Sequence, residues 1–293
     1  MQAETTREWV VMKFGGTSVS SARCWETICE QSKKHLDAGK HVLVVVSALS
    51  GMTNLLTRLA EGADAEERAT IRADIVDRHE CLCRETETEP PGAFLTHRDS
   101  LFELIEVSGK RLQDENRALL LAHGELMSSS LGRRILEKAG LDANWQDART
   151  LLQATEDTEN DLLSVRCGHG PDESLEERLA SQGRLHITQG FIASDSRGRT
   201  CLLGRGGSDT SAACLAARLS ASALEIWTDV PGIFSADPRV VPDARLLRQL
   251  SYMEAQELAS MGAKVLHPPS IQPARHSGIP VWIKDTNRPA EPG

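Results

Sequence analysis

A lysine that precedes a pair of glycines is the first feature of this sequence with chemical potential. Lys13 lies in the apolar stretch "VVMKFGGTSV" (10–19), and Gly15 and Gly16 follow one residue later. Glycines let backbone N–H groups approach an anion closely, and a neighbouring ammonium adds positive charge. The combination suits a phosphate group. A tight turn beside a lysine that snorkels to solvent explains the same letters, so the rest of the chain must decide.

A second glycine-rich stretch, "LLGRGGSDTSAACLAARL" (202–219), leads into an alanine-rich helix. Its glycines can expose N–H groups at the positive end of that helix, and Arg205 offers a bidentate donor for a carboxylate or phosphate. The stretch lacks GxGxxG spacing, and the chain lacks GxxxxGK[ST]. A nucleotide would therefore be held by another device than a Rossmann turn or a P-loop. A plain glycine-rich loop with a surface arginine is the alternative.

Two later stretches add polar groups where a strand or helix ends. In "EIWTDVPGIFSADPRVV" (225–241), Thr228 and Asp229 end a strand, which is where ligands of open α/β sheets bind. In "ELASMGAKVLHPPS" (257–270), Lys264 follows a helix. Taken singly, an ordinary Pro-Gly turn explains the first stretch, and a lysine that complements the helix dipole explains the second.

Strands and helices alternate along the chain, which predicts an α/β fold: a mainly parallel open sheet with helices on both faces. The run "HVLVVVSA" (41–48) is typical of a strand buried on both faces. Other strands are expected at 10–14, 143–146, 186–192, 200–203, 224–228 and 280–284. Helices are expected at 21–38, 125–139, 209–219 and 252–260, the last with a capping box of Ser251 and Glu254. The segment 65–121 has a helical pattern broken at 89–92.

Composition narrows the function classes. The 293-residue chain carries a formal net charge of -9, from 33 Lys and Arg against 42 Asp and Glu. With no long basic block, a nucleic acid partner is not expected. No apolar run approaches the ~18 residues of a membrane span, so no membrane partner is expected. Seven cysteines without a paired framework indicate reduced thiols and a cytoplasmic location.

Seven motifs occur in the order in which aspartate kinases carry them, and the chain resembles that family within the amino-acid kinase fold. They are "KFGGTSV" (13–19), "VVVSALSGMTNLL" (44–56), "HGELMSS" (123–129), "QGFIA" (189–193), "GRGGSDTSA" (204–212), "WTDVPGIFSADPR" (227–239) and "ELASMGAKVLHP" (257–268). The resemblance implies one catalytic domain over 1–286 and an exit segment at 287–293. Its N-lobe, about 1–200, would hold substrate and phosphates, and its C-lobe, about 201–286, would hold ATP.

The resemblance implies transfer of a phosphoryl group from ATP to the side-chain carboxylate of L-aspartate, giving 4-phospho-L-aspartate. This is the first step of lysine, threonine and methionine synthesis and belongs to the diaminopimelate route to lysine. An aspartate carboxylate has an ordinary pKa of about 3.9, so the nucleophile needs no general base at neutral pH. The obstacle is the approach of an anion to a triphosphate, which cations and N–H groups must relieve.

Residue roles follow from the motif positions. Lys13 is expected to bridge the transferred phosphoryl group, Asp209 to hold the lysines in register, and Lys264 to complete the catalytic set. Five residues are expected to bind aspartate: Thr53 and Ser208 by hydrogen bonds, Glu125 at the α-ammonium, Arg205 at the α-carboxylate and Phe191 as a wall. The expected ATP site comprises Lys13, Gly15, Gly16, Ser18, Thr228, Asp229, Phe234, Asp237, Arg239, Lys264 and Val265. Mg²⁺ is expected to be held mainly by phosphates and water rather than by a protein metal site.

The sequence stops at Gly293, where aspartate kinases continue into regulatory ACT domains. The resemblance thus implies a catalytic domain without an ACT domain and without inhibition by lysine or threonine. It leaves open a homodimer, a fusion to a C-terminal regulatory or enzymatic domain, and the kinase part of a bifunctional diaminopimelate decarboxylase/aspartate kinase.

Two alternatives remain at this point. The same fold serves kinases of other acceptors, namely N-acetylglutamate, glutamate, carbamate and uridylate. An acid at Glu125 argues against N-acetylglutamate and uridylate, because neither offers a free ammonium group. A nucleotide-binding subunit without turnover is the other alternative, although it would not need Lys13, Asp209 and Lys264 together.

Overall fold

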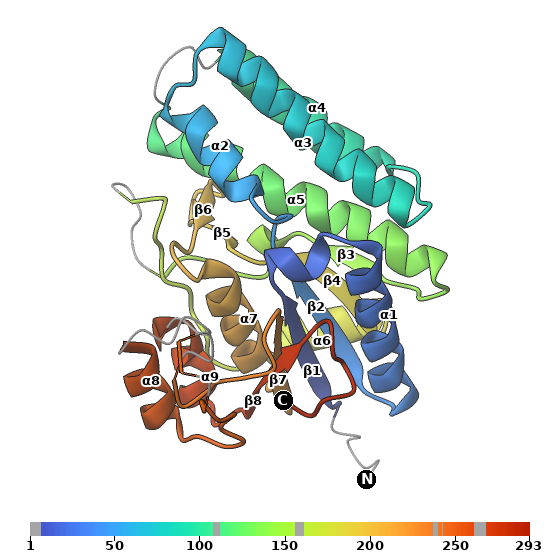
Figure 1. The fold of residues 1–293 in the computed structure, drawn as a ribbon, viewed down its shortest axis with the longest axis vertical. Helices are drawn as coiled ribbons and strands as arrows, with labels where there is room; N and C mark the ends of the chain where they lie inside the picture. Colours follow the sequence, from blue (N-terminus) through green and yellow to red (C-terminus); the bar gives the residue numbers. More distant parts are fainter. Residues whose placement is uncertain (1–6, 108–111, 156–160, 237–239, 242, 261–267) are drawn as a thin grey trace.

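The computed structural model describes residues 7–107, 112–155, 161–236, 240–241, 243–260 and 268–293. Six parallel strands form its main sheet (Figure 1). In spatial order they are β3 (Asn144–Gln146), β4 (Leu185–Gln189), β2 (His41–Val46), β1 (Trp9–Phe14), β7 (Ala223–Thr228) and β8 (Val281–Asp285). The expected α/β fold with a mainly parallel sheet is confirmed.

The central strands are apolar because helices cover both faces of the sheet. Every residue of β1 is buried, and Lys13 is the one charged residue in it. Lys13 pairs in register with Val45 of β2 and Ile226 of β7, so its backbone lies at the centre of the sheet.

Helices α1 (Ala22–Asp37) and α5 (Asp114–Lys138) cover one face, and α6 (Glu173–Gln182) and α7 (Gly207–Arg218) cover the other. The chain moves one way along the sheet from β1 to β2 and the opposite way from β4 to β7 and β8. Because crossovers between parallel strands are right-handed, the two directions place their helices on opposite faces. Gly132 of α5 lets α1 and α5 pack closely against each other on their face of the sheet. A Cβ there would lie 2.2 Å from the Trp25 ring and 2.9 Å from Ile187.

The segment between β2 and β3 contains helices but no strand in its described parts. It contains α2 (Met52–Glu61), α3 (Ala65–Glu85), α4 (Gly92–Val107) and α5. Figure 1 shows α3 and α4 as an antiparallel hairpin, in cyan and green-blue, that lies beyond α2 and α5 from the sheet. The C-terminal part contains α8 (Tyr252–Ser260) and α9 (Gln272–His276). Three short 3-10 turns are η1 (Gly16–Val19), η2 (Ala148–Thr150) and η3 (Pro268–Ile271).

Three sequence expectations about these elements are corrected. Helix α5 begins at Asp114 rather than at 125, so Glu125 lies inside a 25-residue helix. Helix α2 was not expected. The strands expected at 186–192 and 200–203 are partly outside the main sheet, because β5 (Ile192–Ser194) and β6 (Thr200–Leu202) form a separate antiparallel pair.

Two further points concern organisation. The sheet is continuous across the boundary expected near residue 200, because β7 pairs directly with β1.

The capping box of α8 is confirmed: the N–H of Glu254 donates to Ser251 Oγ at 3.2 Å, and the N–H of Ser251 donates to Glu254 Oε2 at 2.7 Å. Among the described residues, no helix is both long and apolar enough to span a bilayer.

Candidate active site

The carboxyl ends of four strands are tied together at one edge of the sheet. Backbone hydrogen bonds join the residue after one strand to the last or penultimate residue of a neighbour: Ser47 N–H to Phe14 O at 3.1 Å, Gly190 N–H to Val46 O at 2.8 Å, and Gly15 N–H to Trp227 O at 3.2 Å. The connection after β1 runs to the α1 face, whereas the one after β7 runs to the opposite face. Open α/β sheets bind ligands beyond the carboxyl ends of neighbouring strands whose connections leave to opposite faces, as those of β1 and β7 do.

Lys13 and Asp209 meet at this edge of the sheet. Lys13 Nζ lies 2.6 Å from Asp209 Oδ1, and the two side chains are 11% and 15% exposed. Asp209 lies in the first turn of α7, so the ion pair joins the two glycine-rich stretches. A Cβ at Gly15 would lie 3.5 Å from Lys13 Nζ, and glycine therefore leaves room beside the ammonium. The structure thus brings together two residues that were predicted from separate motifs.

The turn before α7 packs against the turn after β4. A Cβ at Gly190 would lie 2.6 Å from Ser208 Cβ, and a Cβ at Gly207 would lie 2.6 Å from the Phe191 ring. Phe191 adopts a left-handed backbone with φ of 68°, and its N–H donates to Ser211 Oγ at 2.9 Å. A non-glycine residue in this conformation is strained, which is common at binding sites. Phe191 and Ser208 are therefore adjacent, as expected for one substrate pocket.

Arg205 and Thr53 lie on exposed turns of this edge. Arg205 is exposed at the tip of the glycine-rich turn, whose left-handed Gly204 and Gly206 have φ of 69° and 70°. Thr53 is exposed in the first turn of α2, directly after the left-handed cap Gly51. Both side chains are accessible to a small molecule.

Glu125 is the most buried acid of the expected site, with 3% exposure. Gly124 makes this possible, because a Cβ there would lie 2.8 Å from Ala48, so α5 approaches the end of β2 closely. Burial raises the pKa of Glu125 to about 8, although a backbone hydrogen bond with Ala48 opposes the rise. Its Oε2 has no hydrogen-bond partner within the described parts of the chain. A cation beside this carboxyl group would favour its ionised form.

The nucleotide side is described only in part. Thr228 ends β7, and its hydroxyl lies 3.2 Å from Asp229 Oδ1. Phe234 forms an antiparallel bridge with Leu246. The other four residues expected there lie outside the described residues: Asp237, Arg239, Lys264 and Val265.

Two predicted phosphate contacts do not fit this geometry. Ser18 is 1% exposed; its hydroxyl donates to Trp227 O at 3.4 Å and accepts from Thr286 Oγ1 at 2.7 Å. The N–H of Gly15 is likewise engaged with Trp227 O. Both groups join β1 to β7 and the end of β8, so they hold the phosphate turn in place instead of facing a ligand.

The comparisons with known proteins agree with this geometry. Residues 8–285 match the model of the amino acid kinase family. The chain belongs to the amino acid kinase family. It is 38% identical to lysine-sensitive aspartokinase 3 of Escherichia coli K12 over 98% of this chain, and 34% identical to an aspartokinase of Chlamydia pneumoniae over 97% of it. It spans 63% and 62% of the lengths of these two relatives.

Solved structures show the same similarity. The crystal structure of Escherichia coli aspartokinase III in complex with aspartate and ADP, in its R-state, superposes with a TM-score of 0.84 at 36% identity. It covers 96% of this chain, which in turn covers 63% of that one. The structure of the same enzyme with lysine and aspartate, in its T-state, gives a TM-score of 0.83.

The sequence analysis did not predict a buried ionic cluster that is centred on Glu225 in β7. Glu225 in β7 receives hydrogen bonds from Lys284 Nζ to Oε1 at 2.7 Å and from Trp227 Nε1 to Oε2 at 3.0 Å. His35 Nε2 lies 3.2 Å from Oε1. Burial raises the pKa of Glu225, but the bonds with His35 and Lys284 outweigh it and bring the pKa to about 2. A charged residue within the apolar run "ALEIWT" was the available signal.

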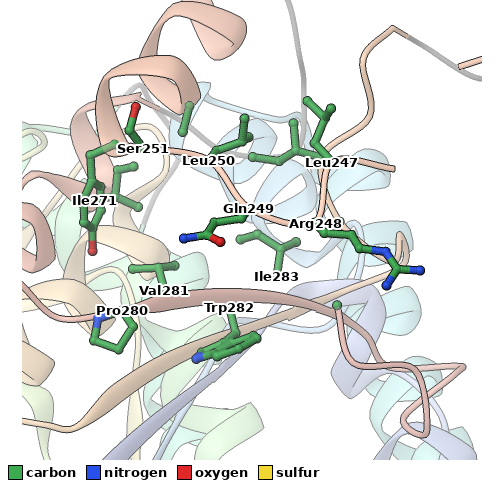
Figure 2. Close-up of a pocket in the computed structure, with 15 residues that line it drawn as sticks. Leu247, Arg248, Gln249, Leu250, Ser251, Ile271, Pro280, Val281, Trp282 and Ile283 are labelled. Carbon is green, nitrogen blue, oxygen red and sulfur yellow. The ribbon is translucent and has the colours of Figure 1, made fainter. Parts of the chain in front are cut away.

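A separate cavity of about 420 Å³ lies along β8 and contains none of the predicted site residues. Figure 2 shows Val281 and Ile283 pointing from β8 toward the segment that carries Leu247, Gln249 and Leu250. Its mainly apolar lining does not suit a triphosphate, whose charges need cations and N–H groups. The cavity along β8 is therefore distinct from the edge of the sheet where Lys13 and Asp209 lie.

Proposed function

We propose that this chain phosphorylates the side-chain carboxylate of L-aspartate with Mg²⁺-ATP, giving 4-phospho-L-aspartate and ADP. The Lys13–Asp209 ion pair of 2.6 Å at the carboxyl edge of the sheet carries the proposal. The similarity to aspartokinases, one of which was solved with aspartate and ADP, supports the choice of substrates. The reaction would begin the synthesis of lysine, threonine and methionine.

The chemistry requires charge neutralisation rather than a base. A carboxylate oxygen of aspartate attacks the γ-phosphorus of ATP, a new P–O bond forms, and the bond from phosphorus to the β,γ-bridging oxygen breaks. No proton moves. Lys13 offsets the charge of the transferred phosphoryl group, and Asp209 fixes the ammonium in place. Mg²⁺ would accompany ATP and offset phosphate charge, and Asp209 would act on Lys13 rather than on the metal.

Recognition of the amino acid falls to Glu125 and Arg205. The α-ammonium of aspartate binds Glu125, whose Oε2 lacks a partner among the described residues. A cation beside this carboxyl group favours its ionised form, so binding releases the proton that the raised pKa retains. Arg205 binds the α-carboxylate, and Phe191 and Ser208 line the pocket between them.

Assembly beyond this chain is also a proposal. Aspartokinases fused to homoserine dehydrogenase occur among the relatives, such as the Haemophilus influenzae protein, which is 32% identical over 97% of this chain. We propose a homodimer or a fusion partner as the setting of the natural enzyme. Sedimentation of the chain tests the homodimer, because a monomer would favour the fusion partner.

The testing experiment measures ADP formation with Mg²⁺-ATP and a panel of acceptors, and it traps the acyl phosphate products of the carboxylic acids as hydroxamates. The panel contains L-aspartate, L-glutamate, N-acetyl-L-aspartate, N-acetyl-L-glutamate and uridylate. We expect turnover with L-aspartate alone, and loss of turnover in Lys13→Ala. N-Acetyl-L-aspartate isolates the ammonium contact, because it keeps both carboxylates. Equal turnover with that compound would contradict the role of Glu125, and ATP binding without any turnover would favour a nucleotide-binding subunit.

A further inference from the structure

Helix α3 reaches the loop that precedes the predicted substrate residue Thr53. Arg78 Nη1 donates to the carbonyl oxygen of Ser50 at 2.9 Å. Asp74, one turn earlier, holds the same guanidinium with two bonds, from Nε to Oδ1 at 2.7 Å and from Nη2 to Oδ2 at 3.0 Å. A Cβ at Gly51 would lie 3.1 Å from Arg78 Nη1, so the loop passes very close to the guanidinium.

Ser50 also links this loop to the predicted phosphate turn, which contains Gly15 and Gly16. The N–H of Ser50 donates to Ser20 Oγ at 2.8 Å, and the Ser20 hydroxyl donates to Gly16 O at 2.6 Å. The contact is tight, since a Cβ at Gly16 would lie 2.9 Å from Ala48 O. Three side-chain bonds thus connect α3, the loop before Thr53, and the turn after Lys13.

Helix α3 is anchored at its far end as well. Glu85 Oε2 accepts from the N–H of Ala22, the first residue of α1, at 3.1 Å. Lys138, at the end of α5, donates to the carbonyl oxygens of Thr86 and Glu87 at 2.9 and 2.8 Å. Helix α3 is therefore held by contacts with α1 and α5, and Arg78 in turn holds the loop before Thr53.

We infer that Arg78 and Ser20 are positioning residues. They hold the loop before Thr53, which is assigned to aspartate, against the phosphate turn. The inference rests on the proposed function, because it assigns the acceptor to the Thr53 side and the triphosphate to the Gly16 side. Phosphoryl transfer depends on the alignment of the attacking oxygen with phosphorus, and a displacement of about 1 Å can cost on the order of 10²-fold in rate. Neither residue needs to touch a substrate.

A purely structural role for Arg78 predicts a different result. Its side chain is 40% exposed and that of Asp74 is 37% exposed, so this ion pair contributes little to global stability. Arg72 is the matched control on the same helix, with 45% exposure. It bonds Glu106 at 3.0 Å and lies over the Phe102 ring at 4.1 Å, and both partners are in α4 rather than at the site.

The test compares Arg78→Met, Ser20→Ala and Ser20→Thr with Arg72→Met in the full 293-residue chain. We expect Arg78→Met and Ser20→Ala to lower kcat/KM for aspartate roughly tenfold, with KM for ATP changed less than about twofold. Ser20→Thr keeps the hydroxyl and should restore most of the activity. Arg72→Met should keep the kinetics of the unchanged chain.

Amide hydrogen exchange supplies a readout that does not depend on activity. Amides in 47–54 should exchange faster in Arg78→Met and Ser20→Ala than in Arg72→Met, while those of the sheet stay protected. Unchanged exchange together with unchanged kinetics would overturn the inference, as would equal losses in Arg72→Met. If the unchanged chain phosphorylates no acid but exchange still responds as expected, the proposed function fails while the loop contact stands.

Discussion

Glu125 in α5 and Glu225 in β7 are both buried, with 3% and 4% exposure, yet their carboxyl groups have opposite surroundings. Glu225 has Lys284, His35 and the Trp227 indole around it, and its pKa falls to about 2. Glu125 has a backbone hydrogen bond with Ala48 and an Oε2 without a described partner, and burial raises its pKa to about 8.

The difference separates a carboxylate that stabilises the fold from one for which we propose a ligand-binding role. A buried charge is tolerated when donors surround it, and Glu225 meets this condition with groups from three elements. A buried acid without such donors is held neutral at a cost to folding, and such acids gather at functional sites. The Lys13–Asp209 pair is intermediate, since it is complete but partly open to solvent.

The largest effect is expected from Glu225→Ala. Removal of one partner of a buried pair leaves Lys284 and His35 without their carboxylate and costs about 3–5 kcal/mol of unfolding free energy. Urea unfolding measures this cost. Glu8→Ala is the control, because Glu8 pairs with Lys40 at 2.6 Å but is 51% exposed. A loss below about 1 kcal/mol in Glu225→Ala, the range of exposed pairs, would erase the contrast between the two glutamates.

Lys13→Ala should lower kcat by roughly 10²–10³-fold, as removal of a single electrostatic donor at a transition state does. Aspartate and ATP should still bind detectably, because residues other than Lys13 also contribute to the recognition of each. Lys40→Ala serves as the control, since Lys40 also forms a 2.6 Å ion pair but lies at the start of β2. A near-normal kcat in Lys13→Ala would remove Lys13 from the phosphoryl-transfer step.

Glu125→Gln should raise KM for aspartate about 10–150-fold, which corresponds to the about 1.5–3 kcal/mol of a hydrogen bond to a charged group. KM for ATP should change little. The amide keeps the shape of the side chain, so the variant tests charge alone. Equal losses for both substrates would indicate that Glu125 supports the architecture of the site, as Glu225 does.

Much of the fold and the two glycine-rich turns were predictable, because their signals are local. Apolar β-branched runs indicated the parallel strands, and the glycines at 15–16 and within 204–207 indicated turns, whereas the phosphate site at the first turn stays a prediction. The burial of Ser18 was not predictable. It depends on Trp227 and Thr286, which lie far away in sequence and reach Ser18 only through the order of the strands.

Other differences arise where tertiary packing overrides a local rule. Gly124 disfavours a helix, yet α5 passes through it because the missing side chain lets the helix approach Ala48. Phe191 adopts a positive φ without being a glycine, so nothing local predicted that β4 would end in a turn there. The cluster around Glu225 was signalled only by a charge in an apolar strand, and its partners come from α1 and β8.

Within any single pH unit, the smallest effect is the opposite response of the two glutamates to pH. The folded pKa of Glu125 is about 8 against 4.5 unfolded, so the folded chain alone binds this proton between these values, and stability falls as pH rises through that window. For Glu225, the folded pKa of about 2 makes stability fall as pH drops below 4.5. Each slope is at most about 1.4 kcal/mol per pH unit.

Urea unfolding from pH 3 to 9 should therefore show that Glu125→Gln flattens the decline between about pH 5 and 8, while Glu225→Gln flattens the decline below about pH 4. Saturating aspartate should act like Glu125→Gln on the alkaline side, because an ammonium beside Glu125 restores its ionised form. This last comparison links the pH dependence of stability to aspartate binding, since only a carboxyl group that is held neutral in the free protein can couple aspartate binding to proton release. If aspartate stabilises the chain equally at pH 6 and pH 8, Glu125 is already ionised or does not meet the ammonium, and its contrast with Glu225 loses its functional meaning.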